Sequence, residues 1–377
     1  MSGSGGFPTF EALRQLEAAR AAGFEPVPLH GTLSPALPPH VVGAVAAALG
    51  RTMKPPSPRG LLALRRAAGA ELTGATDRTV DPETDVLVTN GAMHALGICF
   101  RSLVQPGDEV VVPTPTFFFS GPIRAAGATP VYVHGSEAEA WRWDPEAIER
   151  SIGPRTRAIL LCNPGNPTGT VPSGEEVRGV VAVAEAHGLL VVTDEAYEAA
   201  LWDGTTLTSA FSLAECVVVI RSLGKSLSMP QLRIGIVFGP AEHIARCART
   251  LEWDCLRIGL AAQEAALAAL EGPRDWLADV HHGLVADRAA AIAAVAATPG
   301  LTATPPAAAP FLFLRAEANG NLATGLLEVG LPVVDGVHFQ APGYARLPFG
   351  GAVEATPALS KALAHWSERQ GTAQPGR

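Results

Sequence analysis

Short β-branched runs alternate with longer helix-like stretches over the first 240 residues, and this alternation restricts the fold more than any other feature of the chain. The runs share apolar residues on both faces, as buried parallel strands do, and cover 86–89, 109–112, 130–134, 158–162, 189–193, 217–221 and 234–238. The stretches between them, such as 92–103 and 174–187, have the length and periodicity of helices. The pattern predicts an α/β fold with a mostly parallel central sheet flanked by helices.

The alternation stops near Phe238, and 240–297 has a helical pattern with one break at Gly272. The elements expected after it form a smaller α+β unit: strands at 311–315 and 332–335 and a final helix near 357–370. We therefore expect an N-terminal segment packing on the small domain (1–35), a large domain (36–270) and a small C-terminal domain (271–377).

Charge and cysteine content restrict the partners and the compartment. With 28 Lys and Arg against 36 Asp and Glu, the net charge of -8 disfavours nucleic acid and anionic membranes, which attract clustered positive charge. No charge-free run reaches the ~18 residues of a membrane span. The five cysteines form no CxxC pair, which indicates a reducing compartment, and the first residues show no signal-peptide pattern, so we expect a cytoplasmic protein.

Two clusters of polar residues follow neighbouring strands of the expected sheet. Residues 163–169 read NPGNPTG, and their two Asn-Pro steps and two glycines fix an irregular loop where α/β proteins bind ligands. Asp194 ends the most apolar strand, where an acidic side chain is costly unless it meets a cation or a hydrogen-bond donor.

Two further clusters supply an amine and an anion site. Lys225 follows a buried strand between small residues, and desolvation of such a lysine lowers its pKa and exposes a nucleophile for imine formation. At Gly91 a strand gives way to a helix, whose free N–H groups and dipole favour a phosphate.

In this order, the motifs NPxNPTG, DEAY and SxxK with Arg233 eight residues after Lys225 resemble the class I/II aminotransferase family, the fold type I enzymes that depend on pyridoxal 5'-phosphate (PLP). The resemblance extends from about Leu29 to Leu363. It implies a large PLP-binding domain, a smaller C-terminal domain and a homodimer that transfers the amino group of an L-amino acid to an oxo acid. It implies no metal.

The resemblance also implies roles for individual residues. Lys225 would form the Schiff base with PLP and then act as general acid/base, Asp194 would pair with the pyridinium nitrogen, and Tyr197 and Asn166 would hydrogen-bond the phenolic oxygen. The catalytic residues would be Lys225, Asp194 and Tyr197. The phosphate would be held by residues from three segments: Gly91, Ala92, Met93, Ser222 and Arg233.

Substrate contacts follow from the same resemblance. Phe117 stands where the family places an aromatic ring on the pyridine face, whereas Phe118 and Phe119 are expected in the core. Arg346 would hold the substrate carboxylate through a bidentate fork, together with Asn166 and the backbone of Gly31.

Two departures from the family pattern are visible. The family usually has a tyrosine five residues before the glycine of its GxxxLR segment, but no tyrosine stands at 51–59, so either Lys54 or Ser57 replaces it or the contact is missing. Arg257 stands where relatives tend to have small or polar residues. It either binds an acidic group of the substrate or is an ordinary charge at a helix end.

Other functions remain as alternatives. A PLP-dependent lyase, decarboxylase or oxidase acting on an amino acid or its conjugate would use the same residues. A PLP-sensing regulator is disfavoured because the roughly 30 residues before the family match are too few for a DNA-binding module. The pair His281-His282 lacks an acidic or cysteine partner at metal spacing, so we expect it to be exposed.

Overall fold

The computed structural model describes residues 7–31, 35–50, 57–316 and 321–372. Its main feature is a seven-stranded sheet in the order β1-β7-β6-β5-β4-β2-β3, in which β7 is antiparallel to both neighbours and the other pairs are parallel. The strands are β1 (Val86–Thr89), β2 (Glu109–Thr114), β3 (Thr129–His134), β4 (Thr156–Cys162), β5 (Leu190–Asp194), β6 (Val217–Ser222) and β7 (Gly235–Phe238). The predicted α/β fold with a mostly parallel sheet is confirmed.

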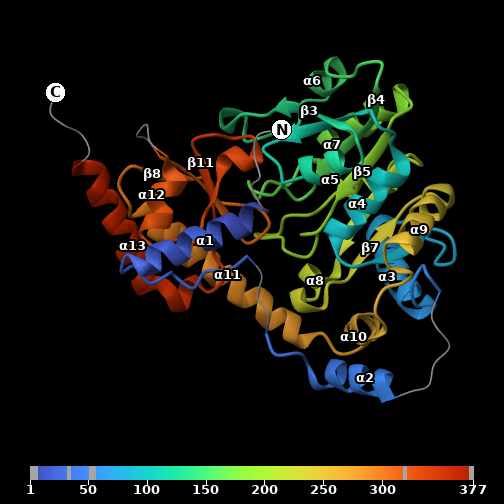
Figure 1. The fold of residues 1–377 in the computed structure, drawn as a ribbon, viewed down its shortest axis with the longest axis horizontal. Helices are drawn as coiled ribbons and strands as arrows, with labels where there is room; N and C mark the ends of the chain where they lie inside the picture. The colour runs from blue at the N-terminus through green and yellow to red at the C-terminus, as the bar shows by residue number, and fades with distance from the viewer. Residues whose placement is uncertain (1–6, 32–34, 51–56, 317–320, 373–377) are drawn as a thin grey trace.

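Helices surround this sheet and form the large domain (Figure 1). They are α2 (Pro39–Gly50), α3 (Leu62–Thr76), α4 (Ala92–Leu103), α5 (Ser120–Ala125), α6 (Pro145–Arg150), α7 (Gly174–Ala186), α8 (Leu223–Ser226), α9 (Ala241–Cys255) and α10 (Leu260–Glu271). Strand β6 is buried along its whole length, which explains the apolar, β-branched run 217–220 at its start. Among the described residues, no helix combines the length and apolarity needed to cross a bilayer.

A second, four-stranded antiparallel sheet lies at the other end of the molecule (Figure 1). Its order is β10-β11-β9-β8, with strands β8 (Leu301–Ala303), β9 (Phe311–Ala316), β10 (Val334–Asp335) and β11 (Tyr344–Pro348). The helices of this unit are α1 (Pro8–Ala21), the long α11 (Asp275–Ala296), α12 (Leu322–Glu328) and α13 (Ala352–Thr372). The expected smaller α+β unit is therefore present.

The sequence prediction differs from the structure in three places. Strand β11 was not expected, because the buried Arg346 at its centre hides the apolar pattern. Strand β8 was also missed, and the helical stretch after Phe238 has a second break, because Leu256 takes a left-handed backbone (φ +61°) that ends α9. Neither the break at Leu256 nor these short strands show a clear periodic pattern of apolar residues in the sequence.

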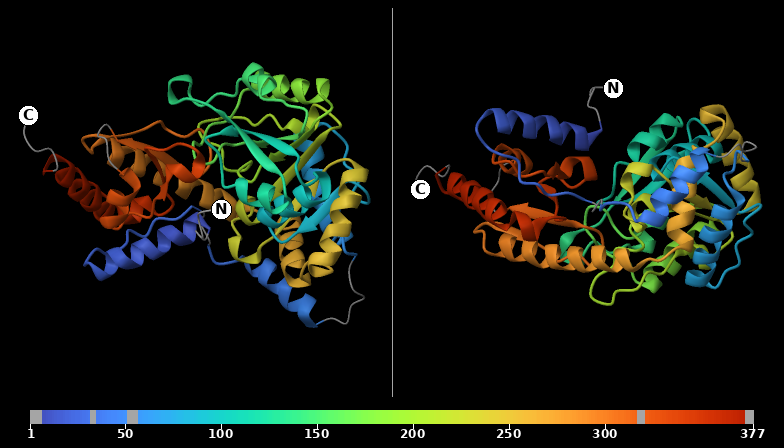
Figure 2. Two further views of the ribbon diagram at one scale, coloured as in Figure 1. Left: turned by 45° about the horizontal axis from the view of Figure 1, so that its top comes forward. Right: turned by 90° about the horizontal axis from the view of Figure 1, so that it is seen from below.

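The N-terminal segment is joined to the C-terminal unit by backbone pairing. His30 and Gly350 form a β-bridge, with N···O distances of 3.0 and 2.9 Å, and the N–H of Val27 donates to the carbonyl of Gly330 at 2.9 Å. Helix α1 lies across the small sheet with its N-terminal end toward the large domain (Figure 2). The beginning of the chain thus depends on its end for its position.

Gly169 joins the NPxNPTG loop to the segment that leads into the small sheet. Its carbonyl accepts the N–H groups of Ala307 and Ala308 at 2.9 and 2.8 Å. Its φ is +67°, and a Cβ at this position would lie 2.3 Å from Cβ of Pro306. Only glycine satisfies both the backbone angle and the contact.

We expect Gly169→Ala to lower the free energy of unfolding by about 2–4 kcal/mol, because the methyl group adds a clash to the left-handed strain. Gly188→Ala is the matched control, since Gly188 has φ +63° but no atom within 4 Å of the added Cβ, so only about 1–2 kcal/mol should be lost. Urea midpoints measure both losses. Equal losses in the two variants would show that the contact with Pro306 contributes nothing.

Candidate active site

A cavity of about 560 Å³ lies where the carboxyl ends of β4, β5 and β6 meet the N-terminal end of α4 and the small domain. The residues that the sequence predicted and that line this cavity are Gly31, Ala92, Met93, Phe117, Asn166, Asp194, Tyr197, Ser222, Lys225, Arg233 and Arg346. Gly91 stands directly before Ala92 as the residue preceding α4. The structure thus brings together residues that lie more than 300 positions apart in the chain.

Lys225 lies on the short helix α8 directly after the buried strand β6. Burial lowers the pKa of its ammonium group to about 8, and the nearby charges of Arg346 and Arg233 act in the same direction. Its Nζ lies 5.5 Å from the ring centroid of Tyr197. About a tenth of this amine is therefore a neutral nucleophile at pH 7, far more than for an exposed lysine.

Asp194 is the last residue of β5, and its carboxylate is buried. Its Oδ1 accepts the backbone N–H of Ala196 at 3.0 Å. Burial nevertheless raises the pKa of the carboxyl group to about 7, an effect that the adjacent Glu195 reinforces and Lys225 opposes. A cationic group placed against Asp194 would restore its ionised form.

Arg346 and Asn166 meet across the cavity, although 180 residues separate them. The guanidinium Nη1 donates to Oδ1 of Asn166 at 2.8 Å. The guanidinium carbon lies 4.3 Å from the ring centroid of Phe311 and 5.0 Å from that of Phe339, and burial lowers the pKa of Arg346 to about 10. Its Nε has no hydrogen-bond partner in the described part of the chain, so this cation lacks an anion.

Gly91 and Arg233 form a cradle at the N-terminal end of α4. Gly91 has φ +81°, and a Cβ there would lie 2.7 Å from Nη2 of Arg233. Gly235 brings the two segments together, because a Cβ on it would lie 2.6 Å from the carbonyl carbon of Gly91. A helix N-terminus beside a guanidinium and the hydroxyl of Ser222 is a favourable place for a phosphate.

Two of the predicted lining residues are aromatic. Tyr197 is buried, and this burial raises the pKa of its phenol. Phe117 is half-buried and stacks on Phe118 with a centroid distance of 4.5 Å. Phe118 and Phe119 pack in two different core clusters, one beneath each sheet.

A buried ion pair lies behind the cavity and fixes the segment that carries Asp194. Glu195 accepts hydrogen bonds from Arg221 at 3.1 and 3.3 Å and from Ser209 Oγ at 2.5 Å. Because neighbours on an extended chain alternate faces, these bonds hold Glu195 on the side away from Asp194. Glu198 lies near the same arginine, and burial raises the pKa of its carboxyl group to about 7.

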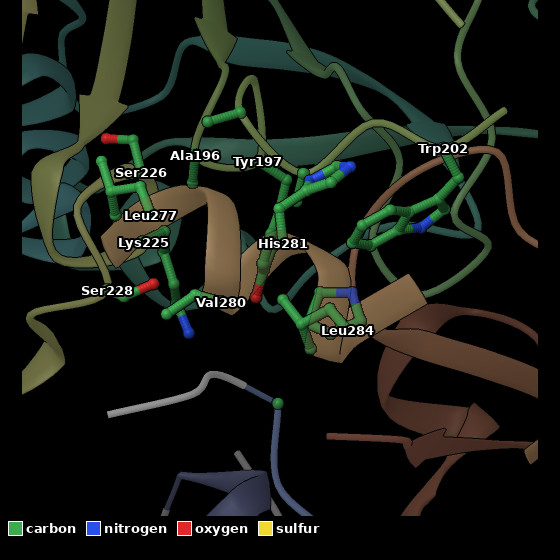
Figure 3. Close-up of a pocket in the computed structure, with 14 residues that line it drawn as sticks. Ala196, Tyr197, Trp202, Lys225, Ser226, Ser228, Leu277, Val280, His281 and Leu284 are labelled. Atoms are coloured by element: carbon green, nitrogen blue, oxygen red, sulfur yellow. The ribbon is translucent and has the colours of Figure 1, made fainter. Parts of the chain in front are cut away.

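A second cavity of about 160 Å³ adjoins Lys225 on the side of α11 (Figure 3). Its walls are mainly apolar and include Leu277, Val280 and Leu284. His281 also lines it, with its ring 5.3 Å from that of Trp202, so the exposure expected for this histidine is wrong. Its neighbour His282 is exposed.

Sequence reasoning missed several residues of the main cavity. Cys162 ends β4 and pairs in register with Asp194, so the strand pattern could have indicated it. Most of the others lie in the N-terminal segment or the small domain, where the sequence offers no motif: Phe7, Thr9, Ala12, Leu13, Leu16, Leu29, His30, Phe311, Pro332, Val334 and Pro348. They reach the cavity only through tertiary packing.

Of the two departures from the family pattern, the residues that the structure describes, Ser57 and Arg257, do not line this cavity. Lys54 falls outside the described residues, and Ser57 is exposed, with its Oγ accepting the N–H of Arg59 at 3.2 Å. Arg257 is exposed in the turn between α9 and α10 and does not line the cavity.

Comparisons with known proteins agree with this geometry. A family model described as aminotransferase class I and II matches residues 25–363. The aspartate aminotransferase of Geobacillus stearothermophilus is 32% identical over 84% of this chain and 85% of its own, and the aspartate/prephenate aminotransferase of Thermus thermophilus is 32% identical over 89% and 88%. The structure of the Thermus thermophilus aspartate aminotransferase with maleate superposes with a TM-score of 0.90 at 28% identity, covering 96% of this chain and 97% of that one.

The raised pKa of Asp194 predicts a pH-dependent stability for the protein freed of small ligands. Between about pH 4 and pH 7 the folded protein retains a proton on Asp194 that the unfolded chain releases, so stability falls as the pH rises through this window. We expect Asp194→Asn to remove a slope of up to about 1.4 kcal/mol per pH unit. Asp279→Asn, at an exposed position on α11, is the control and should leave the slope unchanged. Thermal unfolding from pH 4 to 8 measures the slopes, and identical slopes for wild type and Asp194→Asn would contradict the prediction.

Proposed function

The chain belongs to the aminotransferase class I and II family and is a PLP-dependent aminotransferase, and we propose that its reaction takes place in the cavity around Lys225, with an L-amino acid as amino donor. The observation that carries the proposal is the buried amine of Lys225, whose pKa is lowered to about 8 in the same cavity as Asp194 and Arg346. A nucleophilic amine, a buried acid and a buried cation are the groups that amino-group transfer requires.

The residues of the cavity fit PLP. Asp194 needs a cationic partner to stay ionised, which the protonated pyridine nitrogen would provide. The N-terminal end of α4 with Arg233 and Ser222 would hold the phosphate, while Phe117 would face the ring and Tyr197 and Asn166 would reach its phenolic oxygen. The volume lies within the range of about 300–1,000 Å³ typical of cofactor and ligand sites.

When bound, PLP supplies an electrophilic carbon for amines and withdraws electrons from the substrate α carbon. Lys225 would hold the cofactor through its amine and would move the proton at the substrate α carbon, a role that suits an amine with a pKa of about 8. Arg346 binds the substrate carboxylate through its guanidinium, which Asn166 orients from the side. The same cation then receives the oxo acid that accepts the amino group.

Exposed apolar side chains support assembly into a homodimer. Trp253 is 93% exposed and Leu256 is 67% exposed at the end of α9, and Val42 and Leu49 are exposed on α2. These exposed apolar side chains of the large domain are the surface that we propose for the interface. A second copy of the chain is the partner that we propose.

Compartment and domain boundaries complete the proposal. The described cysteines are all free thiols, including Cys99 and Cys247 with their sulfurs 4.0 Å apart, which supports a reducing cytoplasm. Two separate core clusters, one for each sheet, support a large domain at 36–270 and a small domain at 271–377 with the segment 1–35 on it.

The test of the function is a single-turnover reaction of the holoenzyme with an L-amino acid panel. One oxo acid should form per site without release of ammonia, and a second oxo acid should restore the starting absorbance of the cofactor. We expect Lys225→Ala to slow turnover by at least ~10²–10⁴-fold, because both the attachment and the proton carrier are lost. Lys361→Ala removes an exposed lysine of α13 and should change nothing. Release of ammonia or carbon dioxide in place of an oxo acid would contradict the proposal.

The test of the assembly is a charge placed at the exposed tryptophan. We expect the double variant Trp253→Arg/Leu256→Arg to shift the sedimenting mass from dimer toward monomer, because two like charges meet at a desolvated interface. Val353→Arg, at a position of α13 that is 50% exposed, is the control and should remain dimeric. A dimer that persists in the double variant would place the interface elsewhere.

A further inference from the structure

The part of the main cavity that remains after the cofactor and the substrate carboxylate have been placed is apolar. The charged side chains among the described lining residues are Asp194, Lys225, Arg233 and Arg346. On the proposed function, the first three serve the cofactor and Arg346 serves the α-carboxylate. His30 also lines the cavity, and its ring is packed against the backbone of Gly350 and Gly351.

The remaining wall comes from α1 and the small domain. Helix α1 contributes Leu13 and Leu16, and the facing segments contribute Leu29, Pro332 and Val334. Thr9 supplies one hydroxyl group to this wall.

Phe7, just before α1, closes the wall toward the large domain. Its ring lies 6.1 Å from that of Phe117 and 5.2 Å from that of Phe118. A chain of aromatic rings therefore connects the proposed cofactor position with α1.

The smaller cavity beside Lys225 offers no further cation. Apart from Lys225 itself, its described lining residues include neither lysine nor arginine. The smaller cavity therefore supplies no lysine or arginine besides Lys225 that could pair with a second carboxylate, and His281 is the histidine among its described lining residues.

A substrate with a second carboxylate would have to leave that group among these apolar residues. Burying an ionised carboxylate without a cation costs several kcal/mol, whereas an apolar side chain gains free energy from the same walls. We infer that this enzyme, if it is the transaminase proposed above, acts on L-amino acids with apolar side chains, aromatic or branched aliphatic, with the side chain lying against α1. Its preference then differs from that of the relatives named as aspartate aminotransferases.

Arg257, the second departure from the family pattern, is the cation that the sequence offers as a candidate for a second carboxylate. It is exposed in the turn between α9 and α10 and outside the cavity of its own chain. A variant at this position therefore separates the two possibilities.

The test measures kcat/KM of the holoenzyme for leucine, phenylalanine, aspartate and glutamate with a common oxo acid. We expect the two apolar substrates to exceed the two acidic ones by at least ~100-fold. A preference for aspartate or glutamate would overturn the inference and leave the transaminase function intact, and loss of that preference in Arg257→Ala would assign the second carboxylate to Arg257. Failure of every amino acid to yield an oxo acid would instead overturn the proposed function.

A gain of charge on α1 tests the location of the side chain. Leu13 is 50% exposed, so Leu13→Arg should fold, and its guanidinium would face the cavity. We expect the ratio of kcat/KM for phenylalanine over aspartate to fall at least ~10-fold, mainly through a gain for aspartate. Val353→Arg, at equal exposure outside the cavity, should leave the ratio at the wild-type value. An unchanged ratio in Leu13→Arg, with the fold verified by circular dichroism, would show that the substrate side chain does not lie against α1.

Discussion

Removal of water from three charged side chains is the constraint on which the rest of the structure depends. Asp194 and Arg346 are buried and Lys225 is half-buried, and burial is the largest cause of the pKa shift of each. Two of them stand at or directly after the ends of strands that are buried along nearly their whole length. The large sheet therefore positions polar groups in an environment of lower dielectric constant, where electrostatic interactions are stronger than in water.

The charges of the cavity do not balance within the protein. Three cations, Lys225, Arg233 and Arg346, face one carboxylate, Asp194. A phosphate near α4 and a carboxylate near Arg346 would supply the missing anions at the two ends. Elsewhere the chain balances buried charge internally, as it does between Arg221 and Glu195, so the imbalance marks the place where ligands belong.

The sequence predicts those parts of the site that local chemistry determines. The strands of the large sheet have apolar residues on both faces, a pattern that reflects their burial. The motifs around Asn166, Asp194 and Lys225 follow the ends of these strands, so their proximity in space could be inferred. The apolar wall was not predictable, because Leu13 and Val334 carry no chemical signature and meet only when the N-terminal helix docks on the small sheet. Strand β11 escaped detection because the arginine at its centre is buried for function and breaks the pattern.

The bridge between His30 and Gly350 has a consequence for biosynthesis. A ribosome synthesises residue 30 long before residue 350, so the N-terminal segment lacks its pairing partner after every strand of the large sheet, the last of which ends at Phe238, has been synthesised. During that interval the apolar side chains of α1 have no cavity to line. The strands that carry the proposed cofactor site are thus synthesised first, and the small-domain part of the apolar wall is synthesised last.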